Sequence, residues 1–160
     1  MARWRRAGMT GLIAMTILST VLLCAGTPAS ADGVAEFCTL QLPSGSFTCT
    51  SSPAQASRMI AAVTDGSQVV LGRFYDDPYK QLTDGWFQVT ATSGCDTGTN
   101  WELGVMPSGW NDRISSFQAY ASCDIRLYWD GGLTGPVYGP STGANTLGSF
   151  DNQTSSIGFS

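Results

Sequence analysis

Short runs of residues that favour β-strands dominate the chain from residue 67 onward. They are rich in β-branched and aromatic residues and are separated by clusters of Gly, Pro, Asp and Ser. This spacing is typical of a sandwich or barrel, and it favours antiparallel Greek-key pairing over a parallel sheet because no long helical pattern interrupts the runs. The pattern predicts an all-β domain over residues 67–160, with strands at Gln68–Leu71, Trp86–Thr92, Trp101–Val105, Phe117–Ala121, Ile125–Trp129 and Ser156–Phe159.

Residues 32–66 have a different pattern, which predicts an N-terminal extension made of a hairpin and one short helix. The hairpin spans residues 39–48 and turns at Pro43-Ser44-Gly45. For the helix, Ser52 is a suitable N-cap, Pro53 fits the first helical position and Gln55 completes a Ser-x-x-Gln capping box. We expect a helix over Ala54–Val63 that ends at Asp65-Gly66 and packs on the following domain through Met59, Ile60 and Val63.

The first 31 residues resemble an export signal. Arg3, Arg5 and Arg6 form a basic segment, residues 12–23 are apolar, and Ala29-Ser30-Ala31 is a small-residue cleavage site. The apolar run is too short for a membrane span. We therefore expect a secreted protein whose mature chain begins at residue 32 and keeps 129 of the 160 residues.

Composition narrows the function of that mature chain. Five Lys and Arg oppose twelve Asp and Glu, a net charge of about −7, which argues against nucleic acid and anionic membranes as partners and favours cations. The chain has no histidine, so Ser-His-Asp and Cys-His catalysis and imidazole zinc sites are excluded. Adjacent Asp76 and Asp77 point to opposite faces of an extended strand and are read as turn residues rather than a glycosidase pair.

Four of the five cysteines remain after the signal, and an even number in an exported chain indicates two disulfides. Three pairings are possible. We favour Cys38 with Cys49 and Cys95 with Cys123, because the first pair flanks the expected hairpin. No C-x-x-C spacing supports metal binding by these residues instead.

One internal repeat points to a candidate site. The segments Trp110–Phe117 and Phe150–Ile157 match at an offset of forty, and both contain the pattern N/D-N/D-x-x-S/T-S. Composition alone would give about 0.03 such matches in the chain. The simplest alternative is that the repeat only forms two equivalent turns, since Asn, Asp and Ser favour turns.

These segments resemble the calcium-binding motifs of the βγ-crystallin superfamily, in which two Greek-key motifs pair in one domain. A second similarity is the stretch Tyr128-x4-Leu133-x-Gly135, which resembles the family's folded hairpin with Leu133 in place of the usual second aromatic residue. In the first motif Tyr75 takes the corner position, but its hairpin to Gly85 is longer than the family's. The resemblance covers about residues 68–160 and implies a βγ-crystallin-like sandwich.

The resemblance also implies two calcium sites with exchanged ligands. Site one would use the Arg113 carbonyl, the Ser115 hydroxyl and the Asn152 amide oxygen; site two would use the Gln153 carbonyl, the Ser155 hydroxyl and the Asp112 carboxylate. A hairpin carbonyl near Asp76 or Trp129 and water would complete each shell. Calcium accepts six to eight such oxygens. The candidate metal residues are Asn111, Asp112, Arg113, Ser115, Asp151, Asn152, Gln153 and Ser155.

We therefore expect a secreted, non-enzymatic, calcium-binding βγ-crystallin-like protein with no other cofactor, no nucleic-acid partner and no membrane partner. The alternative is a secreted protease inhibitor or an antifungal or killer-toxin-like protein on the same scaffold, with a protease or a cell-surface target as partner. The resemblance extends to such proteins, and a fold alone does not select among them.

Overall fold

The structure is a computed structural model that describes residues 35–63, 66–96 and 98–160. The expected export signal lies outside the described residues, as does the start of the expected helix stop at Asp65. All described residues belong to one compact unit. None of the helices in these ranges is long and apolar enough to cross a membrane.

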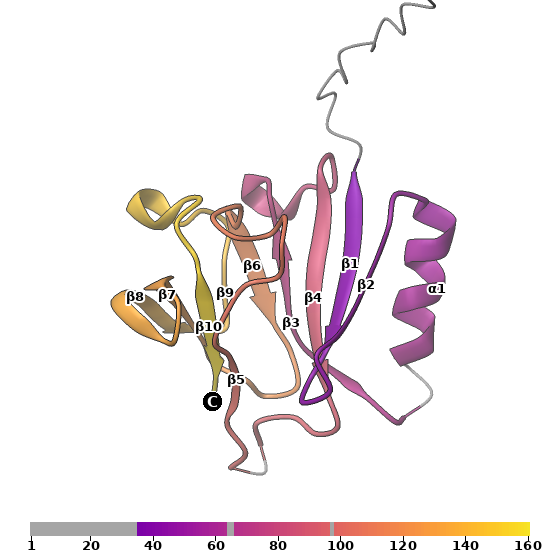
Figure 1. Ribbon diagram of the computed structural model, residues 1–160, viewed down its shortest axis with the longest axis horizontal. Helices are drawn as coiled ribbons and strands as arrows, with labels where there is room; N and C mark the ends of the chain where they lie inside the picture. Colours follow the sequence, from indigo (N-terminus) through magenta and orange to yellow (C-terminus); the bar gives the residue numbers. More distant parts are fainter. Residues whose placement is uncertain (1–34, 64–65, 97) are drawn as a thin grey trace, which may run out of the picture. The chain divides into compact units, whose positions relative to one another are not determined.

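The described residues form ten strands in two sheets (Figure 1). The six-stranded sheet has the order β2-β1-β4-β3-β6-β9, with β1 at Glu36–Gln41, β2 at Ser46–Thr50, β3 at Val69–Tyr75, β4 at Gly85–Ala91, β6 at Ser116–Ala119 and β9 at Gly143–Ala144. The four-stranded sheet has the order β5-β10-β7-β8, with β5 at Trp101–Leu103, β10 at Ser156–Phe159, β7 at Ile125–Asp130 and β8 at Thr134–Ser141. Two short 3₁₀ turns, η1 and η2, span Pro78–Lys80 and Gly148–Phe150.

Strands β3 to β10 divide into two equivalent Greek-key units. In the first unit β3 pairs with β4 and β6, whereas β5 pairs with β10 of the other sheet. In the second unit β7 pairs with β8 and β10, whereas β9 pairs with β6 of the first sheet. Each unit thus contributes its third strand to the other unit's sheet. All of these pairs are antiparallel, which confirms the all-β Greek-key prediction.

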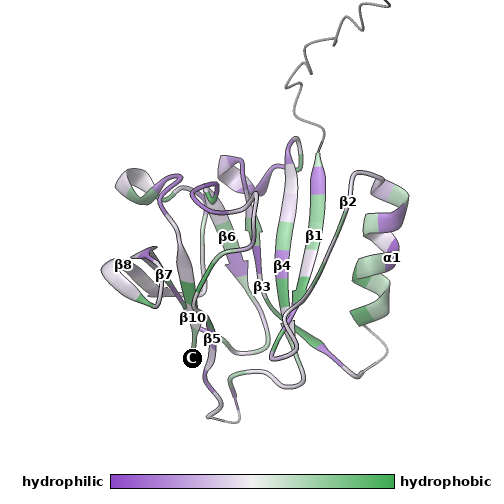
Figure 2. Ribbon diagram, viewed as in Figure 1, coloured by the Kyte–Doolittle hydropathy of each residue, from purple (hydrophilic) through white to green (hydrophobic). Residues whose placement is uncertain are grey.

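The main core lies between the two sheets and is built from aromatic and branched residues. Phe74 stacks on Phe87 and Phe117 with ring centroids 5.8 and 6.1 Å apart, and its ring meets Phe159 edge-on at 6.2 Å. These four rings are fully buried or nearly so. Figure 2 shows the corresponding change between apolar and polar residues along β3 and β6. The two sheets therefore bury these rings between them, whereas β4 is buried along its whole length and β8 is largely exposed.

The extension joins the first sheet by a parallel pairing that the sequence did not predict. β1 runs antiparallel to β2 but parallel to β4, in register from Glu36 opposite Gly85 to Gln41 opposite Thr90. The pairing fits tightly at Gly85, where an added Cβ would lie 1.9 Å from the Glu36 carbonyl oxygen. β1 thereby covers the β4 edge, and the predicted hairpin becomes part of the six-stranded sheet.

The predicted helix is confirmed as α1, Pro53–Val63. Its capping differs from the expected box. The Gln55 N–H donates to Ser52 Oγ at 3.4 Å, but the Ser52 N–H donates to Thr50 Oγ1 at 3.0 Å instead of to the Gln55 side chain. The Thr50 hydroxyl in turn donates to Gln55 Oε1 at 2.5 Å. A threonine before the helix therefore completes the cap.

Helix α1 packs mainly through one residue that was not expected to be buried. Ala56 is buried in a second apolar cluster with Phe37, Tyr75 and Trp86, and Ile60 packs against this cluster. The expected contacts Met59 and Val63 are only half-buried. The helix therefore packs most closely over its first half.

Two further predictions can be compared with the structure. Both favoured disulfides, Cys38–Cys49 and Cys95–Cys123, are present. By contrast, β8 and β9 were missed, and the strand expected over Trp101–Val105 ends at Leu103, with Val105 74% exposed. β8 is almost wholly exposed and contains two prolines and two glycines, so it lacks an alternating pattern.

Candidate metal sites

The two repeated segments fold into equivalent loops that are bonded to each other. Asp112 and Asn152 both adopt a left-handed conformation with φ of 56°. The Asp112 N–H donates to the Thr154 carbonyl at 3.1 Å, and the Asn152 N–H donates to the Ile114 carbonyl at 3.0 Å. Asn and Asp tolerate this conformation better than most residues, which explains why both loops need them there.

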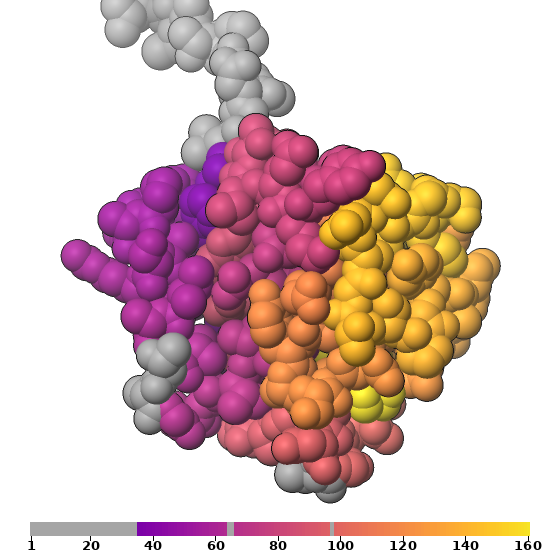
Figure 3. All heavy atoms as spheres, turned by 180° about the vertical axis from the view of Figure 1, so that it is seen from behind, coloured from indigo at the N-terminus to yellow at the C-terminus, as the bar shows by residue number. Residues whose placement is uncertain are grey.

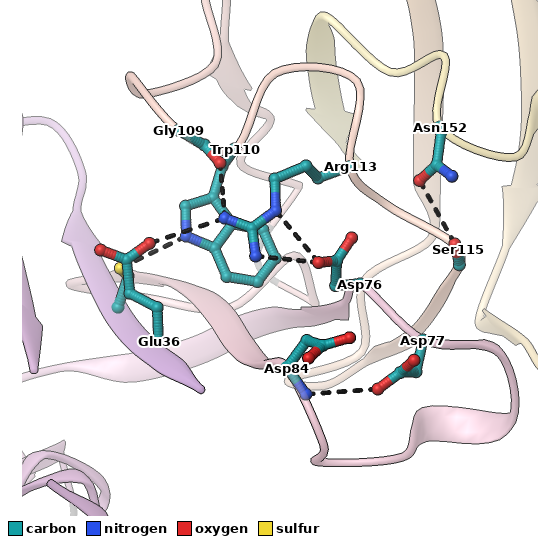
Figure 4. A network of polar contacts seen from close by, with 10 residues as sticks. Glu36, Asp76, Asp77, Asp84, Gly109, Trp110, Arg113, Ser115 and Asn152 are labelled. Atoms are coloured by element: carbon teal, nitrogen blue, oxygen red, sulfur yellow. Dashed lines mark hydrogen bonds and ion pairs between the residues drawn. The ribbon is translucent and has the colours of Figure 1, made fainter. Parts of the chain in front are cut away.

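Site one contains the first exchanged pair of side chains. The Ser115 hydroxyl donates to Asn152 Oδ1 at 3.3 Å (Figure 4). Ser115 is buried immediately before β6, and its N–H donates to the Tyr75 carbonyl at 2.8 Å. Asn152 is exposed. Each motif thus supplies one oxygen: the Ser115 oxygen lies beside the end of a strand, and the Asn152 oxygen lies on an exposed loop.

Site two repeats this arrangement with a charged partner. The Ser155 hydroxyl donates to Asp112 Oδ1 at 3.3 Å, and the Ser155 N–H donates to the Tyr128 carbonyl at 2.9 Å. The other carboxylate oxygen of Asp112 accepts a hydrogen bond from Asn111 Nδ2 at 2.7 Å. The structure therefore places a carboxylate in this pair where site one has an amide.

The second serine of each motif fixes the hairpin of its unit. Ser116 Oγ donates to the Asp77 carbonyl at 2.6 Å and accepts from the Lys80 N–H at 3.0 Å. Ser156 Oγ likewise donates to the Asp130 carbonyl at 2.6 Å and accepts from the Leu133 N–H at 3.0 Å. Lys80 and Leu133 are both left-handed, with φ of 60° and 59°. This matching geometry shows that the two hairpins are equivalent, although the first was expected to deviate.

The role of these two serines was missed by the sequence analysis, although their position is part of the repeated pattern. Ser116 and Ser156 are both fully buried, whereas a turn-forming serine is commonly exposed. Tyr75 and Tyr128 stand opposite them in the sheets, which supports Tyr75 as the corner residue of the first unit. The first hairpin is nevertheless longer, since Gly85 follows Lys80 by five residues and Gly135 follows Leu133 by two.

The side chain of Arg113 is directed to acidic groups beside site one (Figure 4). Its Nη2 and Nε atoms lie 2.8 and 3.1 Å from Asp76 Oδ2, and Nη1 lies 3.7 Å from Glu36 Oε2. Nη1 also donates to the Gly109 carbonyl at 2.8 Å, and the guanidinium lies 4.7 Å from the centre of the Trp110 ring. Arg113 therefore has a defined position that is set by contacts with β1 and the end of β3.

The remaining candidate residues take no part in the two side-chain contacts between the motifs. Asp151 and Asn111 are exposed, and Gln153 is half-buried with its N–H donating to the Phe150 carbonyl at 3.2 Å. Of the eight candidates, the structure brings Asp112, Ser115, Asn152 and Ser155 into side-chain contact across the motifs.

One other group of potential ligands lies in β1 and β2. Glu36, Cys38 and Cys49 have ligand atoms within 4.8 Å of one another. Both sulfur atoms are in a disulfide, so they are not available as thiolate ligands. Among the described residues this group therefore offers one carboxylate and is not a metal site.

One ionisable group near the first hairpin has a shifted pKa. Burial raises the pKa of Tyr75 above its ordinary value, and the nearby Tyr120 raises it further, while Arg73 acts in the opposite direction. Arg73 lies over both Trp86 and Tyr120, at 4.9 and 5.9 Å from the ring centres. Tyr75 is therefore held as a neutral phenol within the second apolar cluster.

Solved structures with a similar arrangement are βγ-crystallin domains. The N-terminal domain of protein S is 24% identical, with a TM-score of 0.40, and the match covers 56% of this chain and 94% of that one. A βγ-crystallin from Ciona intestinalis is 19% identical (TM-score 0.39, 54% and 94% covered), and one from an archaeon is 21% identical (0.38, 56% and 95%). No protein-family model and no curated protein matches the sequence.

The fold is βγ-crystallin-like. This conclusion rests on the paired Greek-key units and their exchanged third strands, which are seen in the chain's own strand pairing. The paired Greek-key units comprise β3 to β10, and β1, β2 and α1 precede them in the chain.

Proposed function

We propose that this protein is exported, has no catalytic activity, and binds two calcium ions that stabilise its βγ-crystallin-like fold. The observation that carries the proposal is the pair of matching contacts between motifs, Ser115 with Asn152 and Ser155 with Asp112. Each contact joins two oxygen atoms 3.3 Å apart. Calcium ligands lie about 2.3–2.6 Å from the ion, so two oxygens at this separation can bind the same ion.

The ligand chemistry also supports calcium over other metals. The contacting atoms are hydroxyl, amide and carboxylate oxygens, which are hard ligands that suit calcium and magnesium. Each pair has one ligand on a strand end and one on an exposed loop, which leaves room for water and backbone carbonyls. Magnesium demands stricter octahedral geometry, whereas calcium tolerates this mixed set.

The two sites differ in charge, and we expect them to differ in affinity. Site two contains the Asp112 carboxylate, whereas the paired side chains of site one are neutral. Calcium affinity rises with ligand charge, so site two is the tighter one. Both fall toward the extracellular range of roughly 10⁻⁴ to 10⁻³ M because few carboxylates are present.

Calcium titration of the oxidised mature chain tests the proposal. Calorimetry should give two binding phases, and calcium at about a hundredfold above Kd should raise the free energy of unfolding by roughly 2.7 kcal/mol per site. The melting temperature should rise accordingly, and chelator should reverse the change. Identical melting curves in excess calcium and in chelator would contradict the proposal and leave the repeat as a pair of turns.

A double variant provides the matched control. Ser115→Ala with Ser155→Ala removes one oxygen from each pair but keeps the strand backbone and the Ser116 and Ser156 contacts. We expect it to melt like the unaltered protein in chelator but to lose most of the calcium response. A full calcium response in this variant would place the ions elsewhere.

A further inference from the structure

Strand β1 of the N-terminal extension contacts the first of the two motif loops. Alternate side chains of a strand point to opposite sides of its sheet, so Cys38 belongs to the main core and Phe37 to the second apolar cluster. Glu36 lies on the same side as Cys38. Figure 3 shows the back of the molecule, where the extension (indigo to purple) lies beside the first unit and the second unit (yellow) lies on the opposite side. The extension is therefore close to one motif and remote from the other.

The backbone of Glu36 is fixed by the parallel pairing with β4. Glu36 stands opposite Gly85, and its N–H donates to the Asp84 carbonyl at 3.2 Å. An added Cβ at Gly85 would collide with the Glu36 backbone, so the two strands approach this closely because residue 85 is a glycine. The Glu36 side chain therefore starts from a defined position at the beginning of β1.

Two side chains of β1 contact two stacked side chains of the first motif loop. The buried Trp110 donates from Nε1 to Cys38 Sγ at 3.3 Å, and its ring packs on Phe87 with centroids 5.6 Å apart. The Arg113 guanidinium lies over the Trp110 ring, 4.7 Å from its centre, and Nη1 lies 3.7 Å from Glu36 Oε2. Cys38 thus fixes the ring on which the guanidinium rests, and Glu36 supplies a negative charge that attracts the guanidinium.

Glu36 and Asp76 contact different edges of the Arg113 guanidinium. Asp76 Oδ2 accepts from Nε and Nη2, whereas Glu36 faces Nη1. In Figure 4 the contact between Ser115 and Asn152 lies on the Asp76 side of the guanidinium, and Glu36 lies on the other side. Glu36 therefore attracts the positive charge away from site one. A guanidinium that moved toward a bound cation would repel it.

The second motif lacks this charged contact. Phe150 stands at the position of Trp110, and its ring meets Trp129 edge-on at 5.4 Å. Gln153 stands at the position of Arg113 and carries no charge. The positively charged side chain thus occurs in the motif that β1 contacts, where a carboxylate from the extension lies beside it.

We propose that Glu36 is a positioning residue for calcium site one. It holds the Arg113 guanidinium over Trp110 and away from the ion, and thereby raises the calcium affinity of that site. This inference rests on the proposed calcium sites and adds a determinant of their affinity. The extension then takes part in calcium binding although none of the proposed ligands belongs to it.

Calcium titration of two matched glutamate variants tests the role of Glu36. Glu36→Gln removes the charge beside Arg113, and Glu102→Gln makes the same change at an exposed position on β5 of the other sheet. We expect Glu36→Gln to weaken the weaker calorimetric phase roughly two- to fivefold, and Glu102→Gln to leave that phase unchanged. The proposal is wrong if the weaker phase is unchanged in Glu36→Gln, or if both variants weaken it equally.

A double-mutant cycle with Arg113→Gln tests whether Glu36 acts through Arg113. In the Arg113→Gln background, Glu36→Gln should cause less than about half of the change that it causes alone, because no guanidinium remains to be held. An equal change in both backgrounds would mean that the Glu36 charge acts on the ion directly. That result would overturn the positioning role.

A measurement without calcium separates this inference from the proposed function. In chelator, Glu36→Gln should shift the NMR signal of the Arg113 Nε–H group, because the guanidinium loses one acidic neighbour, whereas Glu102→Gln should leave the signal in place. An unmoved signal in Glu36→Gln would contradict the positioning role alone. Absence of both calcium phases from the unaltered protein would instead contradict the proposed function, and the positioning role with it.

Discussion

The two motif loops have nearly the same backbone but different side chains around it. Both use a left-handed residue, a strand-end serine bonded to a tyrosine carbonyl, and a buried serine that fixes a hairpin. Beside site one lies the charged contact between Arg113 and Asp76. At the corresponding places site two has Gln153 and Trp129, and the Trp129 ring meets Phe150 edge-on at 5.4 Å.

This difference separates two roles of the motif residues, which are to place the oxygen atoms and to set the local charge. The repeated residues set the positions of the oxygen atoms, because they make the backbone and hairpin contacts. The residues that differ between the two motifs set the local charge, because they vary between Arg and Gln, Asp and Trp, and Asp and Asn. Equivalent substitutions of the residues that place the oxygen atoms should therefore have similar effects in the two units. Substitutions of the residues that set the charge should have different effects in the two units.

The largest effect should come from the buried serines. Ser116→Ala removes one acceptor and one donor from the first hairpin, and Ser156→Ala does the same in the second. Each leaves a backbone N–H and a carbonyl without their partner, at roughly 1–3 kcal/mol per group that stays buried. Urea denaturation in chelator should give similar losses for the two variants. A large loss in one and none in the other would show that the hairpins are not equivalent.

The second-largest effect should be a change in calcium affinity. Asp112→Ala should abolish the tighter phase of a calcium titration, and Asn152→Asp should strengthen the weaker phase, because the ligand charge changes in opposite directions. Calorimetry with Trp fluorescence can follow both phases. The exchanged arrangement is wrong if Asp112→Ala leaves both phases intact, or if Asn152→Asp tightens the phase that Asp112→Ala removes.

A smaller effect is expected at Arg113. Arg113→Gln gives site one the residue that site two has, and it frees the Asp76 carboxylate. The weaker calcium phase should tighten a few-fold, because a nearby positive charge is removed, while stability in chelator should fall by only about 0.2–1 kcal/mol, since the ion pair is partly exposed. The reciprocal Gln153→Arg should weaken the tighter phase. Unchanged phases in both variants would show that these side chains do not set the local charge.

The smallest effect should appear at alkaline pH in the first unit. Because burial raises the pKa of Tyr75, the folded state keeps this proton at a pH where the unfolded chain releases it. Stability should therefore fall as the pH rises above the ordinary tyrosine value of about 10. Tyr75→Phe should reduce this fall in denaturation curves across that range. An equally steep fall in the variant would assign the alkaline loss to other groups.

The sequence predicts the parts of the fold that depend on local patterns. Ser52 and Pro53 placed the helix start correctly, and the forty-residue offset placed the two loops that the structure brings together. Strand β8 could not be found in this way, because its exposed Pro and Gly residues give no alternation. Calcium binding, export and the inhibitor alternative stay predictions.

Contacts between distant segments were harder to predict than the segments themselves. The parallel pairing of β1 with β4 joins residues almost fifty positions apart, and no residue type in Glu36–Gln41 specifies that partner. The interaction of Arg113 with Asp76 and Glu36 likewise depends on three separate segments meeting. The repeat predicted which oxygens come together, but the surrounding charges required the assembled sheets.

The exchange of β5 and β9 means that neither Greek-key unit is a complete folding unit. A chain that ended after the first unit would keep β5 without β10, its strand partner in the described part of the chain, and would expose the apolar side of Phe74 and Phe117. Such a fragment could bury that surface by associating with a second copy, with each copy donating its β5 to the other. A single motif of this kind would therefore have to be an obligate dimer, and the tandem chain is equivalent to that dimer with its subunits covalently joined.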